Sequence, residues 1–169
     1  MRDLDVSSCP VPKEQQPINE YEQLKESWFF GWTVQGWLIY LKKLAWVWGI
    51  SWLVTGPVAA ASFPPGKYPV QFFLCGSGGA MFFVALVLLR LYLGWKYVSD
   101  RLESPTIAYE ESGWYDGQSW PKTSATLTRD KLIVSYEIQP ILRRLQQGFG
   151  TIALWFLVTG IIWYVRSLI

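Results

Sequence analysis

The chain has 169 residues, of which 51% are hydrophobic and only 17% are charged, whereas charged residues make up about 25% of an average soluble domain. Eleven Trp, nine Tyr and nine Phe are present but no histidine, which excludes Ser-His-Asp triads, His-zinc sites and His-ligated haem. A formal net charge of +2 gives no reason to expect nucleic-acid binding. This composition predicts a membrane protein and argues against most enzymes.

Residues 1–18 are predicted to form an extended, proline-rich tail because three prolines alternate with mixed charges. The tail lacks the apolar core of a secretory signal peptide, so we expect the N-terminus to stay on the side of synthesis. Cys9 lies in this tail and Cys75 in a hydrophobic run, so no disulfide is expected between them. Cys9 precedes Pro10, an arrangement that can supply a thiolate ligand to haem, although such dipeptides also occur by chance.

Residues 19–36 are predicted to form an amphipathic interfacial helix. Asn19 is the expected N-cap, and Glu22 follows three residues later as in a capping box. Bulky side chains then recur at helical spacing on one face: Tyr21, Leu24, Trp28 and Trp32. This face suits the membrane surface or a partner protein, but it suits packing against the chain's own middle segment equally well.

Three stretches contain no Asp, Glu, Lys or Arg over 18 to 20 residues, namely 44–61, 70–89 and 148–165. At about 1.5 Å per residue each helix would span roughly 27–30 Å, the thickness of the hydrocarbon core. The alternative, buried helices of a soluble protein, leaves too little chain to cover three such runs. We therefore predict an α-helical integral membrane protein with a transmembrane hairpin over 37–94 and a third transmembrane helix over 148–169.

Basic residues predict how these helices are oriented. Twelve Lys and Arg residues lie before the first span or between the second and third, with Arg90 at the inner end of the second span, whereas only Lys67 and Arg166 lie on the opposite side. By the positive-inside rule, we expect the N-terminus and residues 95–147 in the cytoplasm or its organellar equivalent, and the C-terminus on the far side of the membrane.

The segment 95–147 is predicted to contain a small antiparallel sheet of two or three strands. Strand-like patterns occur at 106–110, around 114–120 and at 131–138. Gln139-Pro140 then suits a helix start that leads into the third span.

Gly76, Gly79 and Ala80 are predicted to form a small-residue seam in the second span, against the first helix or against a partner helix. All thirteen acidic residues lie outside the spans, which argues against proton or ion transport. No constellation of residues supports catalysis, a metal site or a small-molecule substrate. We therefore expect a protein that is not an enzyme.

The many Trp and Phe rings would also suit a flat macrocycle such as chlorophyll or haem. Without histidine, the axial ligand would be Gln35, Gln71, a backbone carbonyl or water. The same rings suit lipid and protein interfaces equally, so the sequence leaves tetrapyrrole binding open.

Residues 9–21 (CPVPKEQQPINEY) and 27–30 (SWFF) resemble the N-terminal signature of the family called hypothetical chloroplast reading frame thirty-six. Its relatives are described as conserved in the green lineage and diatoms. Residues 113–118 (GWYDGQ) and the region 136–140 are also similar to that family, so that the resemblance covers most of the chain from about residue 7.

This resemblance implies a thylakoid membrane protein of a cyanobacterium or plastid, associated with photosynthesis and with acclimation to iron deficiency. It implies no catalytic residues. From it we expect an auxiliary factor for the biogenesis, assembly or stability of chlorophyll–protein complexes, with membrane lipids, photosystem subunits or other assembly factors as partners. The alternative is a carrier that binds chlorophyll or haem.

Overall fold

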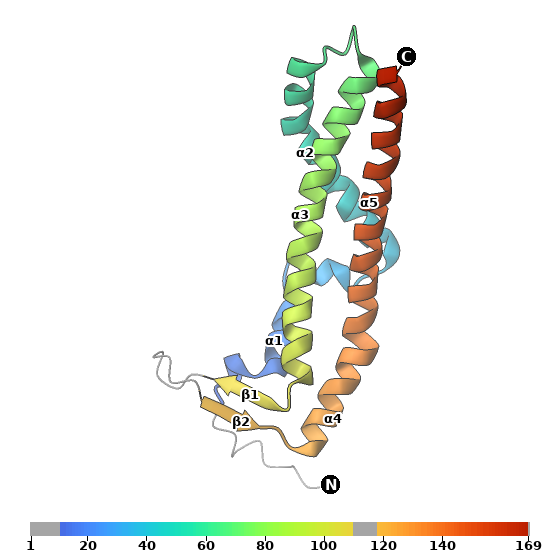
Figure 1. Ribbon diagram of the computed structural model, residues 1–169. Helices are drawn as coiled ribbons and strands as arrows, with labels where there is room; N and C mark the ends of the chain where they lie inside the picture. Colours follow the sequence, from blue (N-terminus) through green and yellow to red (C-terminus); the bar gives the residue numbers. More distant parts are fainter. Residues whose placement is uncertain (1–10, 110–117, 169) are drawn as a thin grey trace. The chain divides into compact units, whose positions relative to one another are not determined.

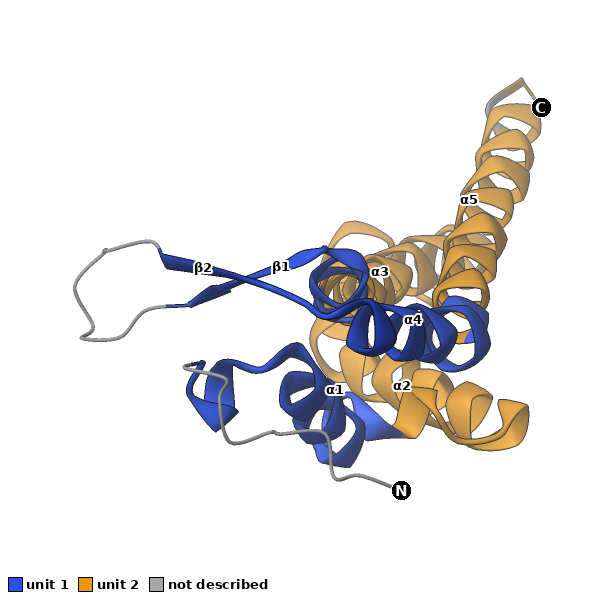
Figure 2. Cartoon of the chain, turned by 90° about the horizontal axis from the view of Figure 1, so that it is seen from below, with its two compact units in different colours: residues 1–31, 94–140 blue, residues 32–93, 141–169 orange. Residues whose placement is uncertain are grey.

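The protein is described by a computed structural model, in which residues 11–109 and 118–168 are sufficiently well placed to describe. The chain divides into two compact units (Figure 2). Unit 1 comprises residues 1–31 and 94–140, and unit 2 comprises residues 32–93 and 141–169. Each unit is described by itself.

Unit 2 is built from three helices that are long and apolar enough to cross a membrane (Figure 1). They are α2 (Trp37–Ser62), α3 (Pro69–Glu103), whose last ten residues belong to unit 1, and α5 (Gln139–Leu168). The three predicted spans lie inside these helices, which confirms that part of the expected fold. Helix α2 continues through Pro57, although proline removes one helical hydrogen bond.

The helices of unit 2 meet through small residues and rings. Gly79 of α3 faces Thr55 of α2, and the buried Leu88 of α3 lies beside Gly148 of α5. Tyr92 of α3 meets Phe149 of α5 edge to face, with ring centroids 6.2 Å apart.

Most of the apolar surface of these helices faces outward. Of the residues in the most apolar window of each, only 11% are buried in α2, 28% in α3 and none in the continuous helix Ser124–Arg166 that contains α5. Contacts within the chain therefore cover little of the three apolar helices.

The described part of unit 1 starts with a short 3₁₀ turn, η2 (Lys13–Gln15), and helix α1 (Pro17–Glu26). Both predicted ends of the helix over 19–36 were wrong, because α1 begins at Pro17 and ends at Glu26. Pro17 occupies the first turn, where its missing N–H costs nothing, and Asn19 instead donates its side-chain amide to the Lys13 carbonyl at 2.7 Å. A short 3₁₀ turn, η3 (Gly31–Thr33), follows before α2.

A two-stranded antiparallel sheet follows α3. Strand β1 (Thr106–Tyr109) pairs with β2 (Gln118–Pro121), with Ile107 opposite Trp120. The strand expected at 131–138 was wrong, because this stretch is helical: α4 (Ser124–Ile133) runs into a π-helical turn, η4 (Val134–Ile138), and then into α5.

The burial pattern explains this error. Asp130, Val134, Ile138, Ile141 and Leu145 are all buried and recur every three or four residues. This is the period of a helix, and it continues past the helix start predicted at residue 139. The alternation seen within 131–138 alone was too short to distinguish the two periods.

A buried ion pair joins the sheet to the helices of unit 1. Lys122, which follows β2, donates from Nζ to the carbonyls of Arg101 and Leu102 at 3.0 and 2.9 Å, at the C-terminal end of α3. The same ammonium lies 3.0 Å from the carboxylate of Asp130 on α4, and both side chains are almost fully buried. A lysine at a helix C-terminus is favoured by the partial negative charge of the last carbonyls.

Candidate functional site

Polar contacts fix the N-terminal arm of unit 1, residues 11–31, on the rest of that unit. The centre of these contacts is Arg101 on α3, whose Nη1 donates to the carboxylate of Glu20 on α1. Its Nη2 donates to the carbonyls of Gln15 and Ala108 at 3.0 and 3.1 Å. One guanidinium therefore joins η2, α1, α3 and β1 of unit 1, a geometry that suits the planar five-donor fork of arginine.

A second polar cluster joins α1 to the π-helical turn. The hydroxyl of Tyr21 donates to Glu137, and Lys25 Nζ lies 3.0 Å from the same carboxylate oxygen. These hydrogen bonds, that from Tyr21 above all, lower the pKa of Glu137, and the pKa of Lys25 is raised chiefly by its bond to Glu137. Burial, followed by the bond to Glu137, raises the pKa of Tyr21.

The π-helical turn itself helps to place this carboxylate. Each residue of an α-helix turns by about 100°, so one inserted residue redirects everything that follows it. Such turns are rare and are found frequently at functional positions. Here η4 carries Glu137, whose carboxylate accepts the hydrogen bond from Tyr21 of α1.

The fixed arm presents a graded series of three aromatic rings directly after α1. Trp28 is 87% exposed, Phe29 is half-buried and Phe30 is buried. Their ring centroids are 6.1 Å apart for the first pair and 5.1 Å for the second. Phe30 packs on Gly94 of α3 so closely that a Cβ at that glycine would overlap its ring. We call residues 28–30 the aromatic ladder.

The structure separates the four residues predicted to share one face of the arm. Tyr21 and Trp32 are buried, and Leu24 is half-buried. Tyr21 packs within unit 1 against Trp95 of α3, with ring centroids 6.2 Å apart. Trp28 alone of the four is exposed, because α1 ends before it.

The predicted small-residue seam lies against α2 of the same chain. A Cβ on Gly79 would lie 2.7 Å from the Thr55 methyl group, and one on Gly76 would lie 2.7 Å from the Trp52 ring. Ala80 is fully buried. Gly76 and Gly79 of the seam therefore pack against α2, which is the intramolecular alternative that the sequence left open.

The three candidate tetrapyrrole ligands have different positions. Cys9 lies outside the described residues. The side chain of Gln35 is exposed, and its carbonyl accepts a hydrogen bond from Arg144 at 2.7 Å. Gln71 is half-buried and lines a cavity.

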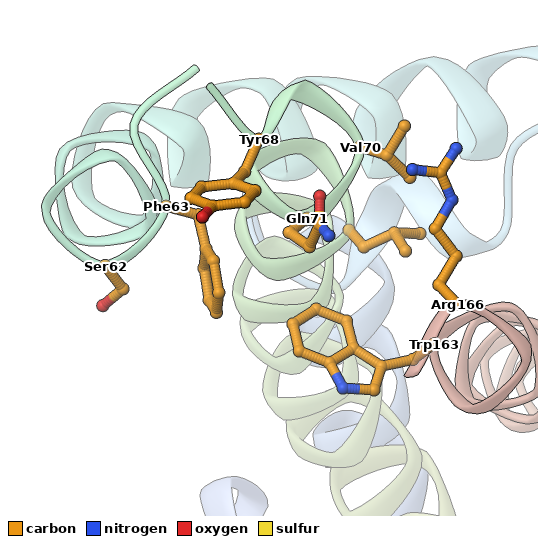
Figure 3. Close-up of a pocket in the computed structure, with 8 residues that line it drawn as sticks. Ser62, Phe63, Tyr68, Val70, Gln71, Trp163 and Arg166 are labelled. Atoms are coloured by element: carbon orange, nitrogen blue, oxygen red, sulfur yellow. The ribbon is translucent and has the colours of Figure 1, made fainter. Parts of the chain in front are cut away.

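This cavity has a volume of about 360 Å³ and lies entirely within unit 2 (Figure 3). Its wall includes Phe63 at the end of α2, Gln71 of α3, and Trp163 and Arg166 of α5. The rings of Phe63 and Trp163 pack edge to face, with their centroids 5.4 Å apart, and both line the cavity. Aromatic rings, one amide and one guanidinium thus surround the same space.

Arg144 holds the start of α2 in unit 2. Its Nη1 donates to the carbonyls of Thr33 and Gln35 at 3.0 and 2.7 Å, and its guanidinium lies 5.1 Å from the Trp37 ring and 5.8 Å from the Tyr40 ring. Backbone carbonyls and the negative faces of two rings provide the environment that a carboxylate would otherwise provide.

Sequence reasoning missed Arg101, Glu137 and Arg144 as organising residues. A single basic or acidic residue in a charged segment carries no spacing signal, and the partners of Arg101 and Glu137 are about 80 to 120 residues away. Within residues 11–109 and 118–168, no group of three or more His, Cys, Asp or Glu side chains is placed to hold a metal ion.

The fold and site define a class: a protein with three long apolar helices, joined to a polar unit that carries an exposed aromatic ladder. The family model described as "CGLD27-like: Conserved in the green lineage and diatoms 27" matches residues 9–151. The chain belongs to this family, as its resemblance predicted.

Named relatives agree with this assignment. A chloroplast protein of Arabidopsis thaliana named Conserved in the green lineage and diatoms 27 is 45% identical over 94% of this chain, which spans about half (49%) of that relative's length. Uncharacterized proteins named ycf36 from Cyanophora paradoxa and Pyropia yezoensis are 45% and 43% identical, over 86% and 88% of this chain and 92% and 90% of their own length. No solved structure matches the chain.

Proposed function

We propose that this protein is a non-enzymatic membrane protein that assists the assembly or stability of photosynthetic chlorophyll–protein complexes, and that it docks on a partner through Trp28. The single observation that carries the docking proposal is the exposure of this indole, 87%, on an arm that polar contacts hold in place. The photosynthetic setting rests on the family resemblance and on the chloroplast location in the printed name of a relative.

The proposed location is the thylakoid membrane, with unit 1 on the stromal or cytoplasmic face. Three helices with apolar windows in which at most 28% of the residues are buried favour a surrounding of lipid. The distribution of Lys and Arg supports the orientation.

The aromatic ladder has the properties of a protein-docking anchor. Tryptophan is enriched among the residues that dominate binding energy at protein interfaces. An anchor that is already fixed loses less conformational entropy on binding than a flexible one. Glu20, Tyr21 and Lys25 fix α1 on its own unit, while the buried Phe30 ring secures the far end of the ladder.

The first test is capture of the tagged protein from its native membrane in mild detergent, with and without the substitution Trp28→Ala. We expect wild type to retain photosystem subunits or assembly factors, and W28A to retain at least about tenfold less, a loss typical of one interface anchor. Membranes from iron-replete and iron-limited cells are compared, because the resemblance implies a role under iron deficiency.

Trp46→Ala is the matched control, because Trp46 is also exposed (62%) but lies on α2 of unit 2. It should leave capture unchanged. Trp32 is unsuitable for this test, since its ring is buried and truncating it would destabilise the fold by about 3–5 kcal/mol. Equal capture by wild type and W28A would contradict docking through the ladder.

The tetrapyrrole-carrier alternative has less support. Gln71 lines a cavity, whereas the Gln35 side chain is exposed and Cys9 lies outside the described residues. The same purification separates the two functions: elution of the protein alone with a Soret band would support the carrier, and elution in complexes with photosystem subunits or assembly factors would support the assembly factor.

A further inference from the structure

We propose that the cavity between the ends of α2, α3 and α5 binds the anionic headgroup of a membrane lipid, with Arg166 as the cationic partner of its phosphate or sulfonate. The inference rests on the membrane location in the proposed function, but not on partner docking.

The distribution of charge in the chain leaves the cavity without an acidic side chain in its own unit. All thirteen Asp and Glu residues of the chain belong to unit 1, whereas unit 2 contains seven Lys and Arg residues and no acid. No carboxylate side chain of its own unit is thus available to Arg166. A guanidinium placed beside low-dielectric surroundings is stabilised strongly by an anion, and its planar fork matches a phosphate or sulfonate by two parallel hydrogen bonds.

The wall of the cavity combines polar and apolar side chains. Figure 3 shows Gln71 from α3, and Trp163 and Arg166 from α5, around one space. The Gln71 amide can donate hydrogen bonds to a second headgroup oxygen. Val70 and Leu74 supply apolar surface beside these polar groups, as the glycerol and first acyl carbons of a lipid require.

The position of the cavity along the three helices also suits a lipid headgroup. The cavity adjoins the turn between α2 and α3 and the last turns of α5, so it lies at the end of the apolar stretches of all three helices. Aromatic rings such as Trp163 and Tyr68 prefer the headgroup level of a bilayer. A lipid held in one leaflet delivers its headgroup to this depth, whereas a freely soluble anion has no need of the apolar wall. A second hollow of unit 2, along Lys42 and Trp46, is formed by α2 alone and brings no groups together from different helices.

The test is lipid binding to the full-length protein in detergent, followed by native mass spectrometry. Phosphatidylglycerol, phosphatidylcholine of the same chain length and inorganic phosphate are titrated separately. We expect retained phosphatidylglycerol, at least about tenfold weaker phosphatidylcholine and no retained phosphate. Arg166→Gln should weaken phosphatidylglycerol binding by at least about tenfold, because charge-assisted hydrogen bonds are lost.

Arg166→Lys should recover part of the affinity, since it keeps the charge but loses the fork. Lys67→Gln is the matched control: it removes the other cation predicted on this side, one that does not line the cavity, and should change binding by less than about twofold. Far-UV circular dichroism establishes that the variants are folded.

Equal binding by wild type and R166Q overturns the proposal, as does equal retention of inorganic phosphate. A Soret-absorbing ligand lost in both R166Q and Gln71→Leu would also overturn it in favour of a pigment site. Resistance of the protein to carbonate extraction is measured in parallel. Failure of lipid binding in a protein that resists extraction refutes the headgroup site and leaves the proposed assembly function standing.

Discussion

The two units stabilise their cationic side chains through different interactions. In unit 1, lysines and arginines meet carboxylates, as in the pairs Arg101–Glu20 and Lys122–Asp130. In unit 2, which has no acid, Arg144 is held by two backbone carbonyls and two aromatic rings. The comparison teaches that directional ion pairs organise the polar unit, while ring and backbone contacts organise the apolar one.

The strongest test of this contrast is Asp130→Ala in unit 1. The substitution leaves the fully buried Lys122 ammonium without its carboxylate, and removing one partner of a buried pair costs about 3–5 kcal/mol. We expect a lower free energy of unfolding by that amount in denaturant titrations in detergent. Asp100→Asn is the control, because it weakens the exposed Lys96–Asp100 pair, for which about 0.5 kcal/mol or less is expected. Equal effects of the two substitutions would contradict a structural role for the buried pair.

The corresponding test in unit 2 is Arg144→Ala. It removes two charge-assisted hydrogen bonds and two cation–π contacts, so we expect a loss of about 2–4 kcal/mol. Arg144→Lys keeps the charge but not the fork and should lie between the alanine variant and wild type. The neighbouring Arg143 is exposed, and Arg143→Ala should change stability by less than about 0.5 kcal/mol. If R143A were as damaging as R144A, the carbonyl and ring contacts would not be what stabilises α2.

Backbone packing in unit 2 is tested by Gly79→Ala. The added methyl would lie 2.7 Å from Thr55 Cγ2 and 3.1 Å from its Cβ, atoms that a β-branched side chain can hardly move. We expect a loss of about 1–3 kcal/mol, the usual cost of overpacking. Gly150→Ala is the control, since nothing lies within 4 Å of that site, and the better helix propensity of alanine predicts a gain of up to about 1 kcal/mol. A neutral G79A would show that α2 and α3 separate easily.

These contrasts also show what the sequence could predict. The three apolar helices were predictable because absence of charge over 18 to 20 residues is a local signal. The position of the seam at Gly76 and Gly79 was predictable because a group of small residues is also a local signal. The helix that packs on it, α2, was not predictable in this way. The end of α1 was missed because Trp28 and Trp32 keep helical spacing after the backbone has left the helix.

The candidate site was only partly predictable. Trp28 was named from its pattern, but its separation from the buried Tyr21 and Trp32 depends on contacts that no local spacing encodes. Arg101 and Glu137 act on residues far away in the chain, and long-range pairs of this kind leave no periodic signature. The strand expected at 131–138 failed because a helical burial period extending beyond that segment outweighed a short β-like run.

The smallest expected effect is the acid response of the arm, which distinguishes the units because only unit 1 has carboxylate side chains. The pKa of Glu137 is lowered by Tyr21 and Lys25, so its stabilising contribution is complete above the ordinary carboxyl value of 4.5 and is lost as pH falls through the folded-state pKa. Lys25, whose pKa is raised, stays protonated throughout this range. Glu20 acts in the opposite direction, because burial raises its pKa and acidification relieves the cost of its charge.

Glu137→Gln separates these contributions. The Lys25–Glu137 pair is about half exposed, so we expect the acid-labile contribution to be at most about 1 kcal/mol, or roughly 2–4 °C in Tm. The variant should be less stable than wild type at pH 7 by this amount, and the difference should shrink as pH falls below 4.5 and through the lowered pKa of Glu137, since the wild-type carboxylate is then progressively protonated. Thermal unfolding of both proteins between pH 7 and pH 3 measures this convergence. A constant difference across that range would show that Glu137 acts through packing and not through its charge, and the contrast between an ion-paired unit 1 and an acid-free unit 2 would then depend on the pairs of Glu20, Asp100 and Asp130.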